Sequence, residues 1–385
     1  MTSISKLIQN ATLWTAAGRC PGQSILIKNQ HIQQIGPSEQ IAAPDGTEII
    51  DADGLIAAPG LIELQINGAF GKDFTQEPDT LWEVARELPR FGVTAFLPTV
   101  ITSPLETVEH AIQVIQRPPD GFQGAEPMGL HLEGPFLNPA RKGAHNPRYI
   151  LQPDPELVAN WSLENGVRLV TLAPEMPGAA ETIRRLRAQG VVVSAGHSMA
   201  TYAQALAAFE AGISYGTHLF NAMPPLEHRS PNLPGALLTT PQVTVGILTD
   251  GIHLHPALIK LIWAAKGSEG ITVVTDAMAA MGMAEGTYIL GDYQVKVADG
   301  SARLENGTLA GSIIAQDQAL RNLMAFTGCS LGEALATFTS TPARVLSLTD
   351  RGSLTPGAIA DVVLLTPDGM VHKTIARGNV LYSIS

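Results

Sequence analysis

Four residues that can bind metals or move protons each follow an apolar run: Glu133, His197, His218 and Asp276. Glu133 lies in the segment 131–136, where glycine and proline end the run. One carboxylate and two imidazoles suit a zinc ion and leave a position for water and substrate. Such an ion lowers the pKa of water and polarises a carbonyl, and Asp276 could take the water's proton and pass it to a leaving amine. The pattern predicts one divalent metal ion held by Glu133, His197 and His218. The ligand types favour Zn²⁺, with iron, cobalt and manganese as alternatives.

Alternating strands and helices must position these residues. We expect eight strands at residues 61–66, 94–99, 128–132, 168–172, 191–195, 213–217, 244–248 and 271–275. We expect helices between most of them, at residues 79–91, 105–116, 179–189, 201–211 and 256–265. This order predicts an α/β fold, a (β/α)₈ TIM-like barrel whose functional groups lie at the C-terminal ends of the strands.

The two ends of the chain carry shorter β-like segments separated by turn residues. They lie at residues 24–28, 31–35 and 48–51 and at residues 361–365 and 380–382. Together they predict a small β-sandwich domain built from residues 1–58 and 353–385, with the barrel at 59–352. Residues 292–306 are expected to form a hairpin inserted between the eighth strand and its helix.

Composition narrows the class of protein. The chain has 385 residues, 45% of them hydrophobic, and a net charge of −11 with no basic run, so nucleic acid is not an expected partner. No apolar stretch approaches the roughly 20 residues that span a membrane, and no signal core precedes Trp14. Cys20 and Cys329 are the only cysteines. These features favour a cytoplasmic enzyme without a disulfide framework or a membrane partner.

Each candidate residue also has a structural interpretation. A single histidine after a strand is more often structural, and Asp276 could be a helix N-cap. His131, two residues before Glu133, faces the same way and could be a rival ligand, but we expect it deeper in the barrel, behind the ligands. His253 and His255 form a second pair, in which we expect a ligand-binding role for His253 and a structural one for His255.

A wider set of segments resembles the N-acetylglucosamine-6-phosphate deacetylase family of the amidohydrolase superfamily. The matching segments are 58–63, 131–136, 141–147, 171–175, 196–197, 217–224, 250–253, 275–277 and 309–312. The block 218–224 is the most specific of them. Residues 352–357 with 360–361 resemble the superfamily's closing strand.

The resemblance implies further roles. Asp276 and His145 would be the catalytic residues, with His145 orienting the acetyl carbonyl. Substrate-binding positions would be Gln65, Ala144, His145, Asn221, Ala222, Arg229, Asp250, His253, Leu309, Ala310 and Gly311. Arg229 would reach a neighbouring subunit's site, which implies a homodimer, although a solvated surface arginine is the alternative.

One departure concerns the first strand, where many amidohydrolases carry a His-x-His pair that holds a second metal. Here Gln65 and Asn67 occupy these positions. Neutral amides are poor zinc ligands, so we expect one metal ion per subunit. The alternative is that both amides form only structural hydrogen bonds.

The reaction implied by the resemblance is metal-dependent hydrolysis of N-acetylglucosamine 6-phosphate to glucosamine 6-phosphate and acetate. The partner would then be a small phosphorylated amino sugar. The nearest alternative is an amidohydrolase acting on another N-acetyl sugar phosphate or a cyclic amide. A non-catalytic scaffold relative is disfavoured because Glu133, His197, His218 and Asp276 are all present.

Overall fold

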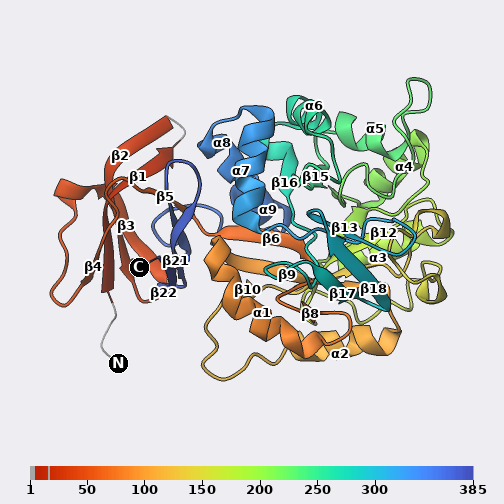
Figure 1. Ribbon diagram of the computed structural model, residues 1–385, viewed down its shortest axis with the longest axis horizontal. Coiled ribbons are helices and arrows are strands. Elements are labelled where there is room, and N and C mark those ends of the chain that lie inside the picture. Colours follow the sequence, from red (N-terminus) through yellow and green to blue (C-terminus); the bar gives the residue numbers. More distant parts are fainter. Residues whose placement is uncertain (1–4, 16–17, 385) are drawn as a thin grey trace.

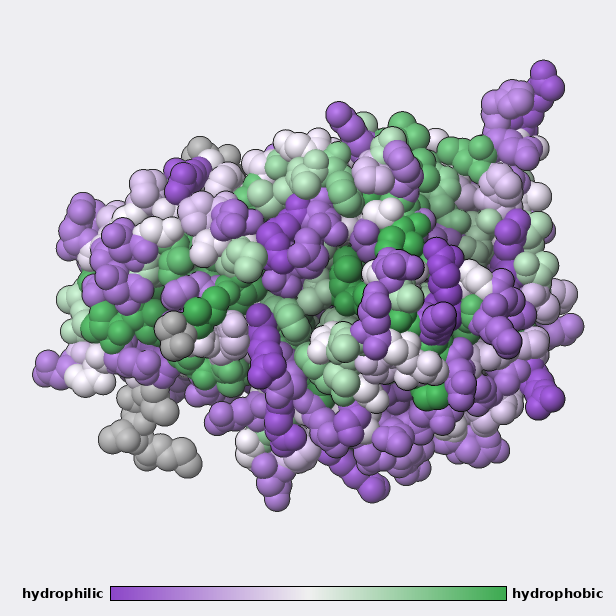
Figure 2. All heavy atoms as spheres, in the orientation of Figure 1, coloured by the Kyte–Doolittle hydropathy of each residue, from purple (hydrophilic) through white to green (hydrophobic). Residues whose placement is uncertain are grey.

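The computed structural model describes residues 5–15 and 18–384. Figure 1 shows a small β domain, built from both ends of the chain, beside a larger α/β barrel. Figure 2 shows that the visible face is mostly polar, with smaller apolar patches between the polar side chains. Among the described residues, no helix is both long and apolar enough to cross a membrane.

The small domain is one eight-stranded sheet to which both chain ends contribute. Its N-terminal strands are β1 (Ser5–Thr15), β2 (Gly18–Lys28), β3 (His31–Pro37), β4 (Glu48–Asp51) and β5 (Ile56–Pro59). Its C-terminal strands are β20 (Val362–Leu365), β21 (Val371–Ala376) and β22 (Asn379–Ser383). Apolar residues from both sets, such as Ile8, Ile25, Leu364 and Ile375, form one buried core. The strands form one continuous sheet around a shared core, to which both predicted terminal segments contribute.

Gly60 joins this sheet to the barrel. Its N–H donates to Asp361 O at 3.0 Å, and a Cβ at this position would lie 2.1 Å from Thr94 Oγ1. Only glycine fits so close an approach. Arg351 also contributes to the junction, since it pairs with both Asp361 and Glu126.

All eight predicted barrel strands are present and parallel. They are β6 (Leu61–Ile66), β9 (Val93–Ile101), β11 (Leu130–Glu133), β12 (Val167–Leu172), β13 (Val192–Ala195), β14 (Tyr215–Gly216), β15 (Thr244–Ile247) and β16 (Ile271–Val273). The barrel closes just beyond β16, where Ile66 bridges Ala277 and Asp276 N–H donates to Gln65 O at 2.8 Å. The predicted (β/α)₈ barrel is confirmed.

The helices lie around the barrel. They are α1 (Leu81–Glu87), α2 (Leu105–Ile115), α3 (Ala179–Ala188), α4 (Tyr202–Ala211), α5 (Asn232–Thr239), α6 (Pro256–Lys266), α7 (Gln316–Thr327), α8 (Leu331–Ala336) and α9 (Ser340–Val345). The helix predicted at 79–91 is broken: α1 is flanked by 3₁₀ turns at Pro78–Thr80 and Leu88–Phe91. Pro89 lies in the second turn, and a proline in a helix interior removes a backbone hydrogen bond and clashes with the preceding turn.

The inserted hairpin is part of a three-stranded antiparallel sheet. Strands β18 (Tyr293–Ala298) and β19 (Ser301–Arg303) fall in the predicted segment, and β17 (Gly286–Leu290) adds a third strand. Two further short pairings occur, β7 (Gly68–Ala69) with β8 (Lys72–Asp73), and β10 (Glu126–Pro127) with β9. Figure 1 shows β17 and β18 in front of the barrel strands in this view.

Candidate active site

The four candidate residues lie at the C-terminal ends of barrel strands, as predicted. Glu133 is the last residue of β11, and His197 and His218 each follow the end of a strand by two residues. These three are buried, with 3%, 5% and 4% of their surface exposed. His197, His218 and Asp276 all have left-handed backbones, with φ of +48°, +32° and +47°. Such conformations are costly for residues with a side chain and cluster at functional sites.

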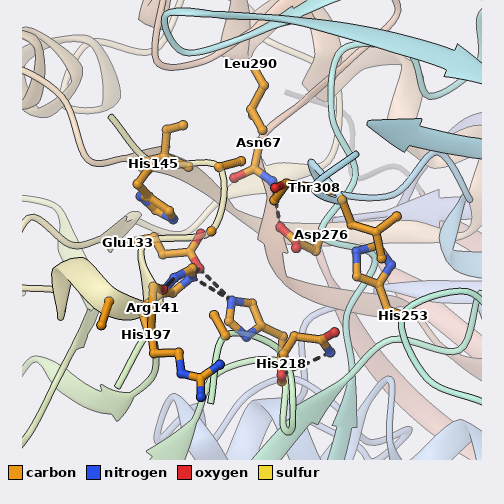
Figure 3. A pocket seen from close by; sticks show the side chains of 18 residues that line it. Asn67, Glu133, Arg141, His145, His197, His218, His253, Asp276, Leu290 and Thr308 are labelled. Atoms are coloured by element: carbon orange, nitrogen blue, oxygen red, sulfur yellow. Dashed lines mark hydrogen bonds and ion pairs between the residues drawn. The ribbon is translucent and has the colours of Figure 1, made fainter. Parts of the chain in front are cut away.

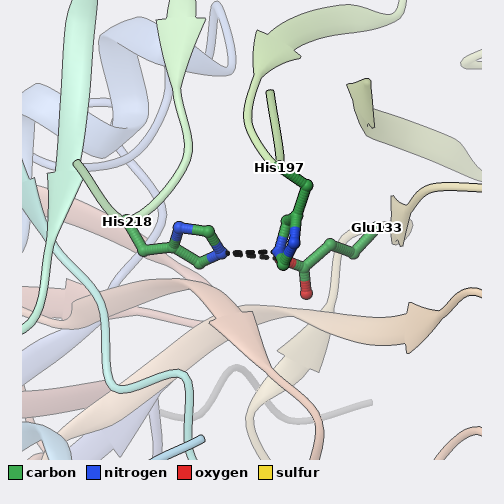
Figure 4. A group of neighbouring side chains, drawn as sticks. All are labelled: Glu133, His197 and His218. Carbon is green, nitrogen blue, oxygen red and sulfur yellow. Dashed lines mark hydrogen bonds and ion pairs between the residues drawn. The ribbon is translucent and has the colours of Figure 1, made fainter. Parts of the chain in front are cut away.

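Three ligand atoms converge in one place (Figure 4). Glu133 Oε1 lies 3.0 Å from His197 Nε2 and 2.9 Å from His218 Nε2, and the two Nε2 atoms are 3.0 Å apart. A tetrahedral ion with bonds of about 2.0–2.1 Å separates its ligands by about 3.3 Å. His197 Nδ1 donates to Arg141 O at 2.8 Å, which leaves the Nε2 lone pair free to ligate. The group therefore fits a divalent metal ion.

Charge is concentrated in this group. Burial alone would raise the pKa of Glu133, but its contacts with His197 and His218 hold that pKa well below its ordinary value. Burial likewise opposes the charged form of His218, yet the hydrogen bond and charge of Glu133 raise the pKa of His218. A cation bound at this position would be the charge partner of the Glu133 carboxylate.

Asp276 stands on the opposite side of the cavity (Figure 3). Its Oδ1 accepts hydrogen bonds from Asn67 Nδ2 at 2.7 Å and Gln65 Nε2 at 3.2 Å. Burial, then the charge of Glu133, raises the pKa of Asp276 to about 6. Gln65 and Asn67 thus hold the carboxylate by their amide donors, and Asp276 caps none of the described helices.

His145 is a third element of the site. Its ring centroid lies 4.4 Å from that of His197, and its Nδ1 accepts from Thr102 N at 3.3 Å. Burial, then the charge of His197, lowers the pKa of His145 to about 3. A neutral ring whose Nδ1 is an acceptor carries its proton on Nε2, so His145 can donate a hydrogen bond from that atom.

His253 is fixed by the loop after β15. Its Nδ1 lies 2.5 Å from Asp250 Oδ2, and Asp250 Oδ1 accepts from the backbone N–H groups of His253 and Ile252. Figure 3 shows the His253 ring beside Asp276. Asp250 therefore orients a ring that faces the cavity.

A cavity of about 290 Å³ collects most of the predicted residues. Predicted positions that line it are Glu133, Ala144, His145, His197, His218, Asn221, Ala222, His253, Asp276, Leu309 and Gly311. Predicted positions that do not line it are Gln65, Asp250, Ala310 and Arg229. Gln65 and Asp250 contact lining residues, Ala310 is fully buried, and Arg229 is exposed on the loop after Pro225.

The cavity also contains residues that the sequence analysis did not single out for binding. They are Asn67, Ile101, Ala140, Arg141, Gly143, Leu290 and Thr308. Arg141 and Gly143 lie inside the segment 141–147, which was recognised as a unit. Leu290 ends β17, and only the position of the inserted sheet brings it to the cavity.

His131 and His255, the two remaining candidate histidines, have structural positions. His131 is fully buried behind Glu133, with Nε2 2.8 Å from Thr171 Oγ1. Burial lowers the pKa of His131 to about 4. His255 Nδ1 accepts from Ala257 N and caps α6, a structural role.

A convergent metal-ligating group and a separate carboxylate at the mouth of an α/β barrel define a metal-dependent hydrolase. The sequence pattern of the Amidohydrolase family matches residues 56–381, and the chain belongs to this family. Similar curated proteins are the N-acetylglucosamine-6-phosphate deacetylases of Lysinibacillus sphaericus and Homo sapiens. The first is 36% identical over 99% of this chain and 98% of that protein, and the second is 38% identical over 86% and 85%.

Solved structures with the same fold include two such deacetylases. The N-acetylglucosamine-6-phosphate deacetylase of Pasteurella multocida has a TM-score of 0.92 and 32% identity, over 98% of this chain and 99% of that chain. A mutant of the Mycobacterium smegmatis enzyme, in complex with N-acetyl-D-glucosamine-6-phosphate, has a TM-score of 0.88 and 31% identity over 100% of both chains.

Proposed function

We propose that the protein hydrolyses the acetamide of N-acetylglucosamine 6-phosphate to glucosamine 6-phosphate and acetate. The observation that carries this proposal is the arrangement of the cavity. Glu133, His197 and His218 form one side, and Asp276 faces them from the other. The full-length similarity to deacetylases of this substrate supports the same reaction.

The chain's own residues have distinct roles in this reaction. A bound divalent ion would supply Lewis-acid polarisation and favour ionisation of water. His145 donates its Nε2 proton as a hydrogen bond to the acetyl carbonyl oxygen and so holds the amide in place. Asp276 accepts a proton from the attacking water and delivers it to the sugar nitrogen as the C–N bond breaks.

Asn221, Ala222 and His253 lie where they could contact the sugar and its phosphate. Leu309 and Gly311 line the cavity on the side of the inserted sheet, with the buried Ala310 between them. Arg229 is exposed and outside the cavity of its own subunit. We propose a homodimer in which Arg229 reaches the neighbouring site and forms a bidentate contact with the phosphate.

We infer that the metal is Zn²⁺, because two imidazoles and one carboxylate suit that ion, and that one ion binds per subunit. Gln65 and Asn67 support this stoichiometry, since their amide N–H groups are directed at Asp276. A cytoplasmic location is supported by the two cysteines, which are both free thiols.

The test is release of free amine from N-acetylglucosamine 6-phosphate, with N-acetylglucosamine measured in parallel. Both are assayed before and after the metal is removed and after zinc is restored. We expect metal-dependent release from the phosphorylated sugar alone. A folded, zinc-loaded protein that releases amine from neither compound would contradict the proposal and direct the search to other N-acetyl sugar phosphates and cyclic amides.

A further inference from the structure

His197 is held on two sides by the loop that follows β11. Its ring Nδ1 donates to Arg141 O at 2.8 Å, and its backbone carbonyl accepts from Asn138 N at 2.9 Å. The residue itself has the left-handed φ of +48°. Because this backbone is intrinsically unfavourable, its neighbours must maintain it.

Glu175 lies in the loop after β12, outside the cavity lining, and is half-buried. Its carboxylate accepts three hydrogen bonds from the two segments around His197. Oε1 accepts from Asn138 Nδ2 at 2.8 Å and from Met199 N at 2.5 Å, and Oε2 accepts from Ser198 Oγ at 2.7 Å. Hydrogen bonds to an ionised acceptor are the stronger kind.

Each of the three residues that donate to Glu175 is also adjacent to His197, in sequence or in space. Ser198 and Met199 directly follow His197, so their bonds fix the chain where it leaves the left-handed residue. Asn138 belongs to the turn that supplies Arg141 O, and its own Oδ1 accepts from Ala140 N at 2.9 Å within that turn. One carboxylate therefore anchors both the chain after the ring and the turn that accepts the ring's proton.

We propose that Glu175 is a positioning residue that fixes the rotation and tautomer of His197 for metal binding. The inference rests on the metal site of the proposed function, although it does not depend on the substrate. Glu175 has no place in the ligand group itself, because that group, among the described residues, consists of Glu133, His197 and His218. Partners that orient a ligating histidine typically contribute 10–100-fold to metal affinity.

The arrangement also links the metal to the sugar side of the cavity. Ser198 N–H donates to Ala222 O at 3.2 Å, and Ala222 lines the cavity next to Asn221. A loosened Ser198 would therefore disturb this wall as well. We expect the loss of metal affinity to exceed any change in KM, because three bonds act on the His197 side and one backbone bond continues to Ala222.

The experiment measures zinc affinity of the full chain by competition with a chromophoric chelator, without substrate. Glu175→Ala removes all three acceptors and should weaken zinc binding about 10–100-fold. Glu175→Gln keeps the Oε1 acceptor and should have a smaller effect. Glu181→Gln, at an exposed position in the first turn of α3, is the matched control and should bind zinc as the unmodified protein does.

Two further readouts separate positioning from general destabilisation. Saturating zinc should restore kcat in Glu175→Ala. The melting temperature of its metal-free form should stay close to that of the unmodified protein, whereas its zinc affinity falls. Unchanged zinc affinity in Glu175→Ala, or an equal loss in Glu181→Gln, would overturn the proposal.

If Glu175→Ala does not fold, Glu175→Gln and Ser198→Ala decide the question. Both act on the bond between Ser198 Oγ and Oε2, and Ser198→Ala also removes the bond that Ala200 N–H donates to Ser198 Oγ. Weaker zinc binding in both supports the proposal, and unchanged binding in both refutes it. Because the zinc-affinity assays contain no substrate, failure of the proposed deacetylation would leave their outcome intact and would remove only the kcat readout, so the two proposals are judged separately.

Discussion

The two sides of the cavity use different chemistry to hold their functional groups. On the metal side, Glu133, His197 and His218 are all ionisable and their ligand atoms lie within 3.0 Å of one another. On the opposite side, Asp276 is held by the neutral amides of Gln65 and Asn67. The first arrangement needs a cation, whereas the second satisfies its carboxylate with hydrogen bonds. The contrast explains how one cavity can contain both a group that fits a metal ion and, apart from it, a carboxylate held only by neutral donors.

One buried ionisable residue lies behind each side of the cavity, and both are neutral at pH 7. His131 lies behind Glu133, and burial lowers its pKa to about 4, so it is neutral at pH 7. Glu63 lies behind Gln65 on β6, and burial raises its pKa to about 8, so it is protonated at pH 7. Neither contributes a charge at neutral pH, and the charges remain at the mouth of the barrel.

The substitution Asp276→Asn is the strongest test of the difference between the metal side and the Asp276 side of the cavity. The amide has the same shape but cannot accept the water's proton, so kcat should fall about 10²–10⁴-fold. Zinc affinity should stay within a few-fold, because Asp276 lies outside the ligand group. Steady-state kinetics and chelator competition on one preparation check both expectations, with the exposed Asp120→Asn as control. Substantial turnover in Asp276→Asn would remove Asp276 from the mechanism.

Glu63 provides a test through stability. Its pKa is about 8 in the folded protein against an ordinary value of 4.5, so between these values the folded state binds more protons than the unfolded state. The free energy of unfolding should therefore fall as pH rises from about 4.5 to about 8, by an amount on the order of a few kcal/mol.

Glu63→Gln removes this titration and keeps one acceptor oxygen, so it retains one of the two bonds that Gln65 N and Thr275 N donate to Glu63, and the loss of the other is the same at every pH. Urea unfolding of the metal-free proteins at pH 5.5, 6.5 and 7.5 makes the comparison. The variant should lose the part of the slope that Glu63 supplies, and equal slopes would show that Glu63 does not titrate in this range.

Asn67→Ala tests the amide side alone. It removes the 2.7 Å hydrogen bond to Asp276, and loss of a bond to a charged group costs about 1.5–3 kcal/mol. We expect kcat to fall about 10–100-fold while zinc affinity is unchanged. Kinetics again measure the Asp276 side, and chelator competition measures the metal side. A variant with weaker zinc binding but unchanged kcat at saturating zinc would show that Asn67 supports the metal side instead of Asp276.

Sequence patterns predicted the barrel because helical stretches separate most of the eight expected strands, and they predicted Glu133, His197, His218 and Asp276 because each follows an apolar strand. They also identified Gln65 and Asn67 as the departure from a second metal site, but not their bonds to Asp276, which join strands about 210 residues apart in the chain. The left-handed backbones of His197 and Asp276 carry only a weak signal in residue type, since neither is glycine, although Asp and His adopt this conformation more often than most residues. The contribution of Leu290 depends on how the inserted sheet docks, which local patterns do not specify.

The smallest expected effect concerns Arg229, which lies on neither side of its own cavity. Its removal in Arg229→Ala should raise KM for the phosphorylated sugar about tenfold and leave kcat nearly unchanged, since a bidentate phosphate contact binds substrate without touching the reacting bond. The exposed Arg184→Ala on α3 is the control.

Co-expression of Arg229→Ala with Asp276→Asn shows whether Arg229 acts on its own subunit or on the neighbouring one. In a mixed dimer whose Arg229 acts across the interface, the subunit with intact Asp276 receives Arg229 from its partner, and half of the sites in that dimer regain the original KM. If Arg229 acts within its own subunit, no site in the mixture combines both residues, and the low-KM activity stays absent.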